Sequence, residues 1–345
     1  MNLQTKLARC LALLPLPLLV SCADGTGGGT ARVVRTSSLT EIAISSSPGW
    51  PEFLLAQGPG QFLWGDRQKV VRIENAQAGP VGMELAQGLD RLVAAARNAA
   101  GDVAFLDASG RVAIHSPESK KTWSFKTSLS HRPGNLALSA DRVYLLLRDE
   151  FETGSAVVAY DFQGNEVGRW GEMPADGIIQ ASLKGGGIAA CPDGSVYYSY
   201  INSPRVFRLP EAGEEDVRQI GERPDSFRVL AAGRVYKANE ESMDARSVAP
   251  LVKLGLSASR VMALACSEEG LLFRQVAQPA GAGAHVEVWD PVSEILLSTV
   301  PVSGGVLLDV KDQTLYIGTM PEGRDFTLER IHVRVEPLRR AEATG

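Results

Sequence analysis

Histidine, cysteine and carboxylate side chains are the first candidates for chemistry in this chain, and their spacing decides what they could do. The four histidines, His115, His131, His285 and His332, lie far apart, and none joins a cysteine pair at zinc-ligand spacing. The glycine runs at Gly185-Gly186-Gly187 and Gly304-Gly305 lack the Lys and Ser or Thr of a phosphate loop. No Gly-x-Ser-x-Gly elbow occurs. Local motifs therefore predict no metal, no cofactor and no catalytic residue.

Asp66, Asp107 and Asn202 recur at similar places and could be imagined as a ring of metal-binding oxygen ligands. Each follows a short apolar stretch and precedes a basic residue and a second apolar stretch. Asp and Asn side chains accept hydrogen bonds from the backbone two residues further on, and hairpin turns select them for this reason. We therefore interpret the three residues as turn residues and not as metal ligands.

The elements around these turns repeat along the chain. A second strand of each unit begins near Phe62, Val103, Val143, Val196, Val235, Leu271 and Leu315, at steps of 36 to 53 residues. A period near 40 to 45 residues with short alternating strands is typical of four-stranded propeller blades. Seven signals predict an all-β propeller of seven blades. The unit at Val235 is weak, because Lys237–Ser242 is a poor strand exit, so six blades with a long insertion is the close alternative. We expect no amphipathic helix.

Three units carry a sharper resemblance. The segments Phe62–Ile73, Val103–Ile114 and Val196–Phe207 each run as strand, Asp or Asn turn, basic residue and returning strand. They resemble the hairpins of NHL-type repeats and of six-bladed, TolB-like propellers of bacterial envelopes. This resemblance implies a propeller fold and no particular activity.

The segment Ala159–Trp170 resembles a quinoprotein propeller motif but has Gly164 and Asn165 where Thr and Gly belong. Trp123 ends one other unit in a similar way, so the motif is not iterated. We expect Trp170 to pack between blades.

Both chain ends should help to close the ring. The last unit supplies three strands and then reaches Pro337 with no fourth, so we expect a strand from Leu39–Ile44 to complete its sheet. Such closure removes exposed sheet edges. The predicted propeller body covers residues 33–336, followed by a polar tail at 337–345.

Two cysteines remain in the body, Cys191 and Cys266. Each follows a short Ala-rich strand and precedes an acidic turn, so they occupy equivalent places in two units. Equivalent positions in different repeats are normally further apart than the roughly 4.4 to 6.8 Å between Cα atoms that a disulfide needs. We therefore expect two buried free thiols and a body that is stable without a disulfide.

The first thirty residues indicate export. Lys6 and Arg9 precede an apolar stretch, Leu11–Val20, that is too short to span a bilayer. The stretch ends in Leu19-Val20-Ser21-Cys22, which resembles the bacterial lipobox; the alternative is an ordinary secretory signal beside a chance cysteine. The resemblance implies a signal peptide at 1–21 and lipid attached to Cys22. Residues 22–32 are Gly-rich and should form a flexible tether. Ala23, where enterobacterial lipoproteins retained in the inner membrane use Asp, favours the outer membrane in a two-membrane cell.

Composition excludes one class of partner. Removal of Lys6 and Arg9 with the signal leaves 33 of the 35 Lys and Arg against 40 Asp and Glu, and no basic stripe is present. Nucleic acid is therefore not an expected partner.

Two functions stay open. The first is a cell-envelope binding or scaffold module without intrinsic catalysis, anchored to the membrane by lipid, for an envelope protein or a small ligand. The second is a calcium-dependent lactonase or lyase. The segments that interrupt the repeat most, Trp170–Gly187, Asn239–Pro250 and Gln278–Ala284, are the expected places for a partner.

Overall fold

The computed structural model describes residues 31–36, 42–43, 50–58, 60–65, 70–74, 77–80, 88–129, 133–147, 155–172, 183, 185–210, 216–221, 224, 227–279, 283–302, 304–319 and 326–337. The predicted signal peptide, Cys22, the tether as far as residue 30 and the tail at 338–345 lie outside this set. No helix in the described part of the chain is long and apolar enough to cross a bilayer.

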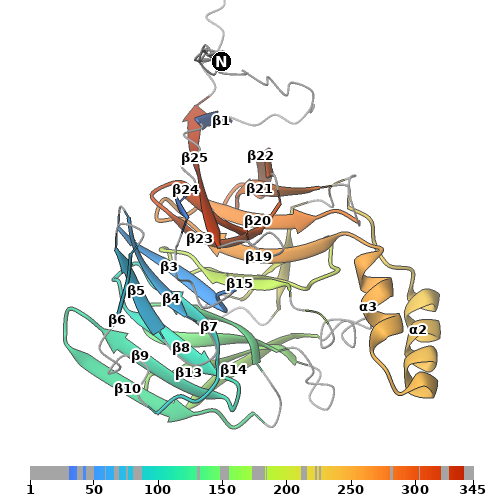
Figure 1. The fold of residues 1–345 in the computed structure, drawn as a ribbon, viewed down its shortest axis with the longest axis horizontal. Coiled ribbons are helices and arrows are strands. Elements are labelled where there is room, and N and C mark those ends of the chain that lie inside the picture. Colours follow the sequence, from blue (N-terminus) through green and yellow to red (C-terminus); the bar gives the residue numbers. More distant parts are fainter. Residues whose placement is uncertain are drawn as a thin grey trace, which may run out of the picture.

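The described residues form six antiparallel sheets, which we call blades 1 to 6 (Figure 1). Blade 1 is β3 (Phe53–Gly58), β4 (Gln61–Gly65), β5 (Val70–Glu74) and β6 (Gln77–Pro80). Blade 2 is β7 (Leu92–Arg97), β8 (Val103–Asp107), β9 (Arg111–Ser116) and β10 (Lys121–Lys126). Blade 3 is β11 (Pro133–Leu138), β12 (Arg142–Leu147), β13 (Ser155–Asp161) and β14 (Glu166–Glu172).

Blade 4 is β15 (Gly187–Ala190), β16 (Val196–Ser199), β17 (Val206–Arg208) and β18 (Arg218–Ile220). Blade 5 is β19 (Arg260–Cys266), β20 (Leu272–Ala277), β21 (Ala284–Asp290) and β22 (Ile295–Val302). Blade 6 is β23 (Val306–Lys311), β24 (Thr314–Thr319), β25 (Thr327–Pro337), β1 (Ala31–Thr36) and β2 (Ile42–Ala43).

The first strands of the blades close a ring. Each of β3, β7, β11, β15, β19 and β23 contacts the next in this order, and β23 contacts β3. The β-propeller prediction is therefore confirmed, and its close alternative of six blades is the number that the described residues form. The seventh signal, at Val235, is wrong, because Val235 lies in a helix.

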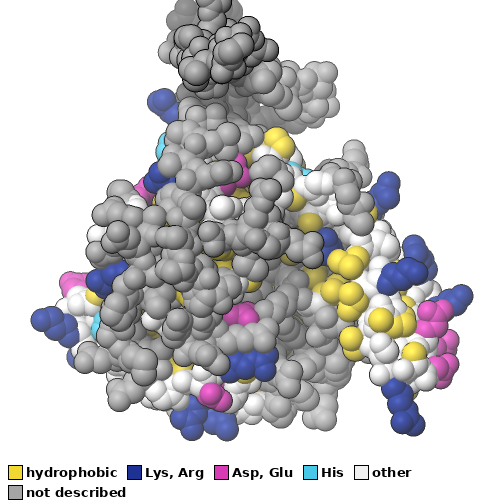
Figure 2. All heavy atoms as spheres, viewed as in Figure 1, with side chains coloured by type: hydrophobic (Ala, Val, Ile, Leu, Met, Phe, Trp, Pro, Cys, Tyr) yellow, Lys and Arg dark blue, Asp and Glu magenta, His cyan; other side chains and the backbone are white. Residues whose placement is uncertain are grey.

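The seventh unit is a helical insertion between β18 and β19. It holds α2 (Ala232–Ala245) and α3 (Ala249–Leu256), so the expectation of no amphipathic helix is also wrong. Val235 and Ala238 of α2 are spaced by three residues and pack with Leu251 and Leu254 of α3. The insertion projects from the ring in Figure 1, and apolar side chains gather beside it on the face in Figure 2.

Blade 6 is completed by the N-terminal segment, which confirms that both chain ends close the ring. All six residues of β1 pair with β25. The strand expected at Leu39–Ile44 is short, because only Ile42 and Ala43 pair there, at the opposite end of β25. The main closing strand therefore lies earlier than predicted, and it begins two residues before the predicted start of the body.

Apolar side chains fill the spaces between neighbouring blades. Leu106 and Ile114 of blade 2 pack with Leu145 and Val158 of blade 3, and all four are almost completely buried. Successive side chains of a strand point to opposite faces of its sheet, so each strand contributes side chains to the spaces on both sides of its blade. Burial of each Leu, Ile or Val side chain contributes about 1.5 to 3 kcal/mol.

A disulfide joins Cys191 and Cys266, whose Cα atoms are 5.2 Å apart, so the expectation of free thiols is wrong. Cys191 directly follows β15 and Cys266 ends β19, and these two first strands contact each other. The two cysteines do occupy equivalent places, but their blades are adjacent because the helical insertion is not a blade. First strands of adjacent blades converge at the centre of the ring, where equivalent positions come within disulfide distance.

Candidate functional site

A cavity of about 420 Å³ opens at the centre of the ring, where the first strands begin. All six first strands or the residues just before them contribute to its wall. Most of the wall is apolar or glycine, including Trp50, Val93, Met262 and Leu308. Glu52, Arg91 and Asn135 add polar groups at the same rim. Gly185-Gly186 and Gly304-Gly305 directly precede the first strands β15 and β23, and Gly185 and Gly186 also line the cavity.

A bulge recurs at the cavity wall. The pairing register shifts near the start of β7, β11, β19 and β23, and the extra residues are Val93, Gly134, Met262 and Leu308. All four line the cavity. Bulges bend a strand, redirect side chains and are frequent beside functional sites. The repeated bulge therefore shapes this end of the channel in the same way in four blades.

Asn135 fixes part of the rim, since its side-chain amide donates a hydrogen bond to the Gly186 carbonyl at 3.3 Å. This contact joins blade 3 to the glycine turn before blade 4. Gln275 of β20 acts similarly: it accepts a hydrogen bond from the Leu307 N–H at 2.7 Å and donates one to the Gly305 carbonyl at 2.9 Å. Backbone groups at the cavity wall are thus satisfied by amides from neighbouring blades.

A polar chain of contacts follows directly behind the cavity wall. Asp309, the residue after Leu308, accepts hydrogen bonds from the N–H groups of Ala56 at 2.7 Å and Val310 at 2.9 Å. The Arg97 guanidinium lies 3.6 Å from the same carboxylate. Burial raises the pKa of Asp309, although Arg97 and the two backbone N–H groups act in the opposite direction. Blades 6, 1 and 2 meet through this carboxylate.

Two of the three candidate turn residues, Asp107 and Asn202, lie in the part of the chain that the structure describes. Asp107 accepts hydrogen bonds from the N–H groups of Ser109 at 2.8 Å and Arg111 at 2.9 Å, as expected for a turn. Asn202 lies in the turn between β16 and β17, as predicted, but its side-chain amide donates to the carbonyl of Ser259 at 3.0 Å and so holds the end of the helical insertion, not its own turn. Asp66 lies outside the described residues.

The described histidines are also separate. His115 and His332 face Thr122 and Thr314 at their blade surfaces, His285 lies 3.5 Å from Glu287, and His131 is outside the described set. Within the described ranges, no three His, Cys, Asp or Glu side chains come together in a way that could hold a metal ion.

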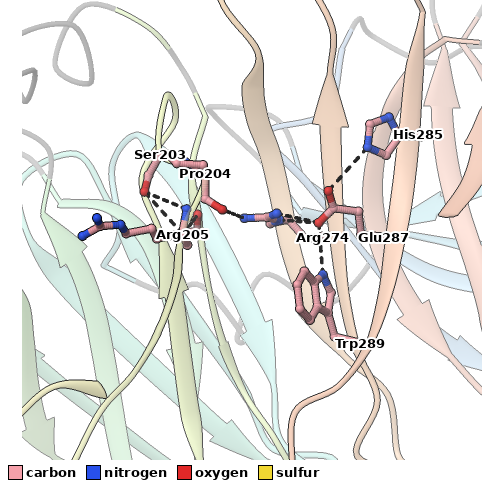
Figure 3. A network of polar contacts seen from close by, with 8 residues as sticks. Ser203, Pro204, Arg205, Arg274, His285, Glu287 and Trp289 are labelled. Atoms are coloured by element: carbon pink, nitrogen blue, oxygen red, sulfur yellow. Dashed lines mark hydrogen bonds and ion pairs between the residues drawn. The ribbon is translucent and has the colours of Figure 1, made fainter. Parts of the chain in front are cut away.

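Glu287 is the centre of a buried network between blades 5 and 4 (Figure 3). Its Oε2 accepts hydrogen bonds from Arg274 Nε at 2.7 Å and Trp289 Nε1 at 3.0 Å. Arg274 also donates to the Pro204 carbonyl in blade 4 at 2.9 Å. Burial alone would raise the pKa of Glu287, but hydrogen bonds from His285 and Trp289 and the Arg274 charge outweigh it and lower that pKa. The network ties two blades together away from the cavity.

Trp170 packs between blades, as predicted. It contacts the core shared by blades 3 and 4, and its ring centroid is 6.5 Å from that of Tyr144. It also lines a second cavity of about 360 Å³ with Arg142, Ser195 and Arg208. Of the segments expected to receive a partner, Asn239–Pro250 lies in the helical insertion, and parts of the other two lie outside the described residues.

Comparison with known proteins supports the fold and goes no further. No known family profile matches the sequence, and no curated protein matches it. Among solved structures, a member of the DUF4221 family from Bacteroides vulgatus has a TM-score of 0.57 at 10% identity, over 90% of this chain and 100% of that one. A proposed gluconolactonase has a TM-score of 0.54 at 13% identity, and the match again covers 90% of this chain and 100% of that one. The calcium-binding protein regucalcin from Agrobacterium tumefaciens has a TM-score of 0.50 at 12% identity, and the match covers 88% of this chain and 98% of that one.

Sequence reasoning missed the polar residues behind the cavity. Asp309 interrupts the apolar strand Val306–Val310, and Arg97 ends the apolar run Leu92–Ala96. A charged residue within an apolar first strand is unusual unless it is paired, and this was the available signal. The sequence could not show that the two strands belong to blades on either side of blade 1.

Proposed function

We propose that this protein is a lipid-anchored envelope protein that binds a small ligand in the central cavity, without intrinsic catalysis. The observation that carries the proposal is the cavity itself. Its volume of about 420 Å³ falls within the range of about 300 to 1,000 Å³ usual for small-molecule sites. Such sites are usually lined by apolar residues with a few polar side chains, and this wall is built mostly from apolar residues and glycines with Glu52, Arg91 and Asn135 among them.

A small ligand suits this cavity better than an envelope protein does. The wall is concave and is made by six strands that converge, whereas protein partners usually occupy a broad surface. An envelope protein bound at the helical insertion or at the rim loops would be the scaffold form of the same binding function.

The lactonase or lyase alternative needs residues that hold and use a divalent ion. A propeller fold alone does not supply them, because the same fold carries many functions. The described acidic, histidine and cysteine side chains offer no cluster of three for such an ion. Among the described residues, the alternative therefore has no cluster to which its metal chemistry can be assigned.

Export is supported by two independent features. Leu19-Val20-Ser21-Cys22 is the basis of the proposed lipid anchor, and the Cys191–Cys266 disulfide is of a kind that persists in oxidising compartments. Mass spectrometry of the mature amino terminus should find a diacylated Cys22. An unmodified terminus at another residue would contradict the anchor.

The ligand proposal is tested by blocking the cavity. Met262 lines it and belongs to none of the core clusters of the described residues, so Met262→Trp should fill the cavity with little disturbance of the blades. Small molecules that stay bound to the wild-type protein in native mass spectrometry should be absent from this variant. Met243→Trp on the exposed face of α2 is the matched control and should keep them.

Two results would replace the proposal. Retention of the same molecules by Met262→Trp would place binding elsewhere. Chelator-sensitive hydrolysis of lactones by the pure protein, together with a stoichiometric divalent ion, would favour the enzyme.

A further inference from the structure

Two buried hydrogen-bond donors lie behind the cavity wall without a partner. Arg97 Nη1 and Gln57 Nε2 are inaccessible to solvent and have no hydrogen-bond partner among the residues that the structure describes. A buried donor left unpaired costs about 1 to 3 kcal/mol, more when it is charged. Such donors in a native protein call for an acceptor, which can be a ligand or water.

The two donors belong to neighbouring first strands. Arg97 is paired with Val103, and Val103 packs against Phe53 and Leu55 of β3, so Arg97 lies on the face of blade 2 that meets blade 1. Gln57 is the extra residue of the bulge in β3. It directly follows Ala56, whose N–H reaches the same Asp309 carboxylate that Arg97 approaches.

Asp309 does not satisfy the hydrogen-bond donors of Arg97. Its nearest approach to the guanidinium is 3.6 Å, longer than a charge-assisted hydrogen bond of about 2.7 to 2.9 Å. Both carboxylate oxygens accept backbone N–H groups instead. Asp309 therefore orients Arg97 from one side, while Nη1 remains available.

The two donors lie beyond the cavity wall: neither Arg97 nor Gln57 lines the cavity, but other residues of their strands do. Ala95 and Leu308 line it, Arg97 follows Ala95 by two residues on the same face of β7, and Asp309 directly follows Leu308. We propose that Arg97, assisted by Gln57, binds the carboxylate of a ligand whose apolar part occupies the central cavity. This inference rests on the proposed function and specifies its ligand as a small apolar carboxylic acid.

The alternative occupant is a water molecule. Water would satisfy the two donors whatever ligand fills the cavity, so an acid and its neutral amide would then bind equally. An arginine that contacts the ligand instead favours the carboxylate, since hydrogen bonds to charged groups are roughly twice as strong as neutral ones.

The test compares 4-phenylbutyrate with 4-phenylbutyramide by isothermal titration calorimetry on the full mature protein. The wild type should bind the acid at least about tenfold more tightly than the amide. Arg97→Gln should bring the two affinities within about threefold, and Arg111→Gln, at an exposed arginine of β9, should keep the preference. Gln57→Leu should weaken the acid several-fold and should fold normally, because it removes an unpaired buried donor.

Equal affinities for acid and amide in the wild type would overturn the inference, as would a preference that survives Arg97→Gln or no binding of either compound at millimolar concentration. An acid affinity unchanged in Gln57→Leu would overturn the role of Gln57. The Met262→Trp variant separates this inference from the proposed function. If Met262→Trp abolishes binding of both compounds while Arg97→Gln changes nothing, the cavity is the binding site and the arginine anchor is wrong.

Discussion

The Cys191–Cys266 disulfide should contribute strongly to stability, because it joins residues separated by 75 positions. In the chain-entropy treatment, closing a loop of this length in the unfolded chain corresponds to about 4.5 kcal/mol at 25 °C. This is an upper value. Residual structure in the unfolded chain, for example in the helical insertion inside the loop, lowers it.

The native state should change little when the bond is removed. β15 and β19 contact each other independently of the disulfide, and Cys191 lies in the core that blades 4 and 5 share. We therefore expect Cys191→Ala/Cys266→Ala to fold into the same ring and to lose about 2 to 4 kcal/mol of unfolding free energy. Urea unfolding followed by circular dichroism measures this loss.

The reduced wild-type protein is the matched control, since it keeps both sulfur atoms and lacks only the bond. Its loss of unfolding free energy should be close to that of the double variant. A loss below about 1 kcal/mol in both would refute the argument from the unfolded chain. Alkylation of both cysteines in the folded protein without a reductant would refute the pairing itself.

Glu287→Gln should destabilise the protein by about 3 kcal/mol, because it leaves Arg274 buried without its counter-charge. The native pKa of Glu287 lies below its ordinary value of 4.5, so its ionisation stabilises the fold above that pH. This stabilisation is lost as the pH falls through the native pKa. The decrease of Tm on acidification should therefore be less steep in the variant, and an unchanged slope would contradict the lowered pKa. Replacement of residues 229–258 by a short Gly-Ser loop should leave the ring folded, because Arg228 and Ser259 at the two ends of the insertion already share a backbone hydrogen bond of 3.0 Å. Circular dichroism should lose its helical part only, and loss of the β signal as well would show that the insertion is part of the ring.

The strands of the six blades could be predicted from the sequence because their pattern is local. The second strands that begin at Gln61, Val103, Arg142, Val196, Leu272 and Thr314 match six of the seven expected positions. The failure at Val235 is local too. Alternation was assumed there, whereas Val235 and Ala238 are spaced for a helix that buries one face against α3.

The expectation for the cysteines failed for a related reason. Equivalent positions in different repeats were expected to lie beyond disulfide distance, and a blade at Val235 would also have stood between the two cysteines. The sequence determined that the two residues are equivalent in the repeat. Only the ring, in which the first strands of adjacent blades converge, decided that they are within reach of each other.

The candidate site depends on tertiary structure in the same way. The sequence by itself predicted an export signal and a tether, and it indicated the propeller repeat and the absence of local catalytic motifs, because these are patterns of neighbouring residues. The cavity has walls from six strands, and Arg97, Ala56 and Asp309 come together from three blades although more than 200 positions separate Arg97 from Asp309. A site assembled at the axis of a ring has no sequence spacing of its own, since its distances are set by the closure of the ring.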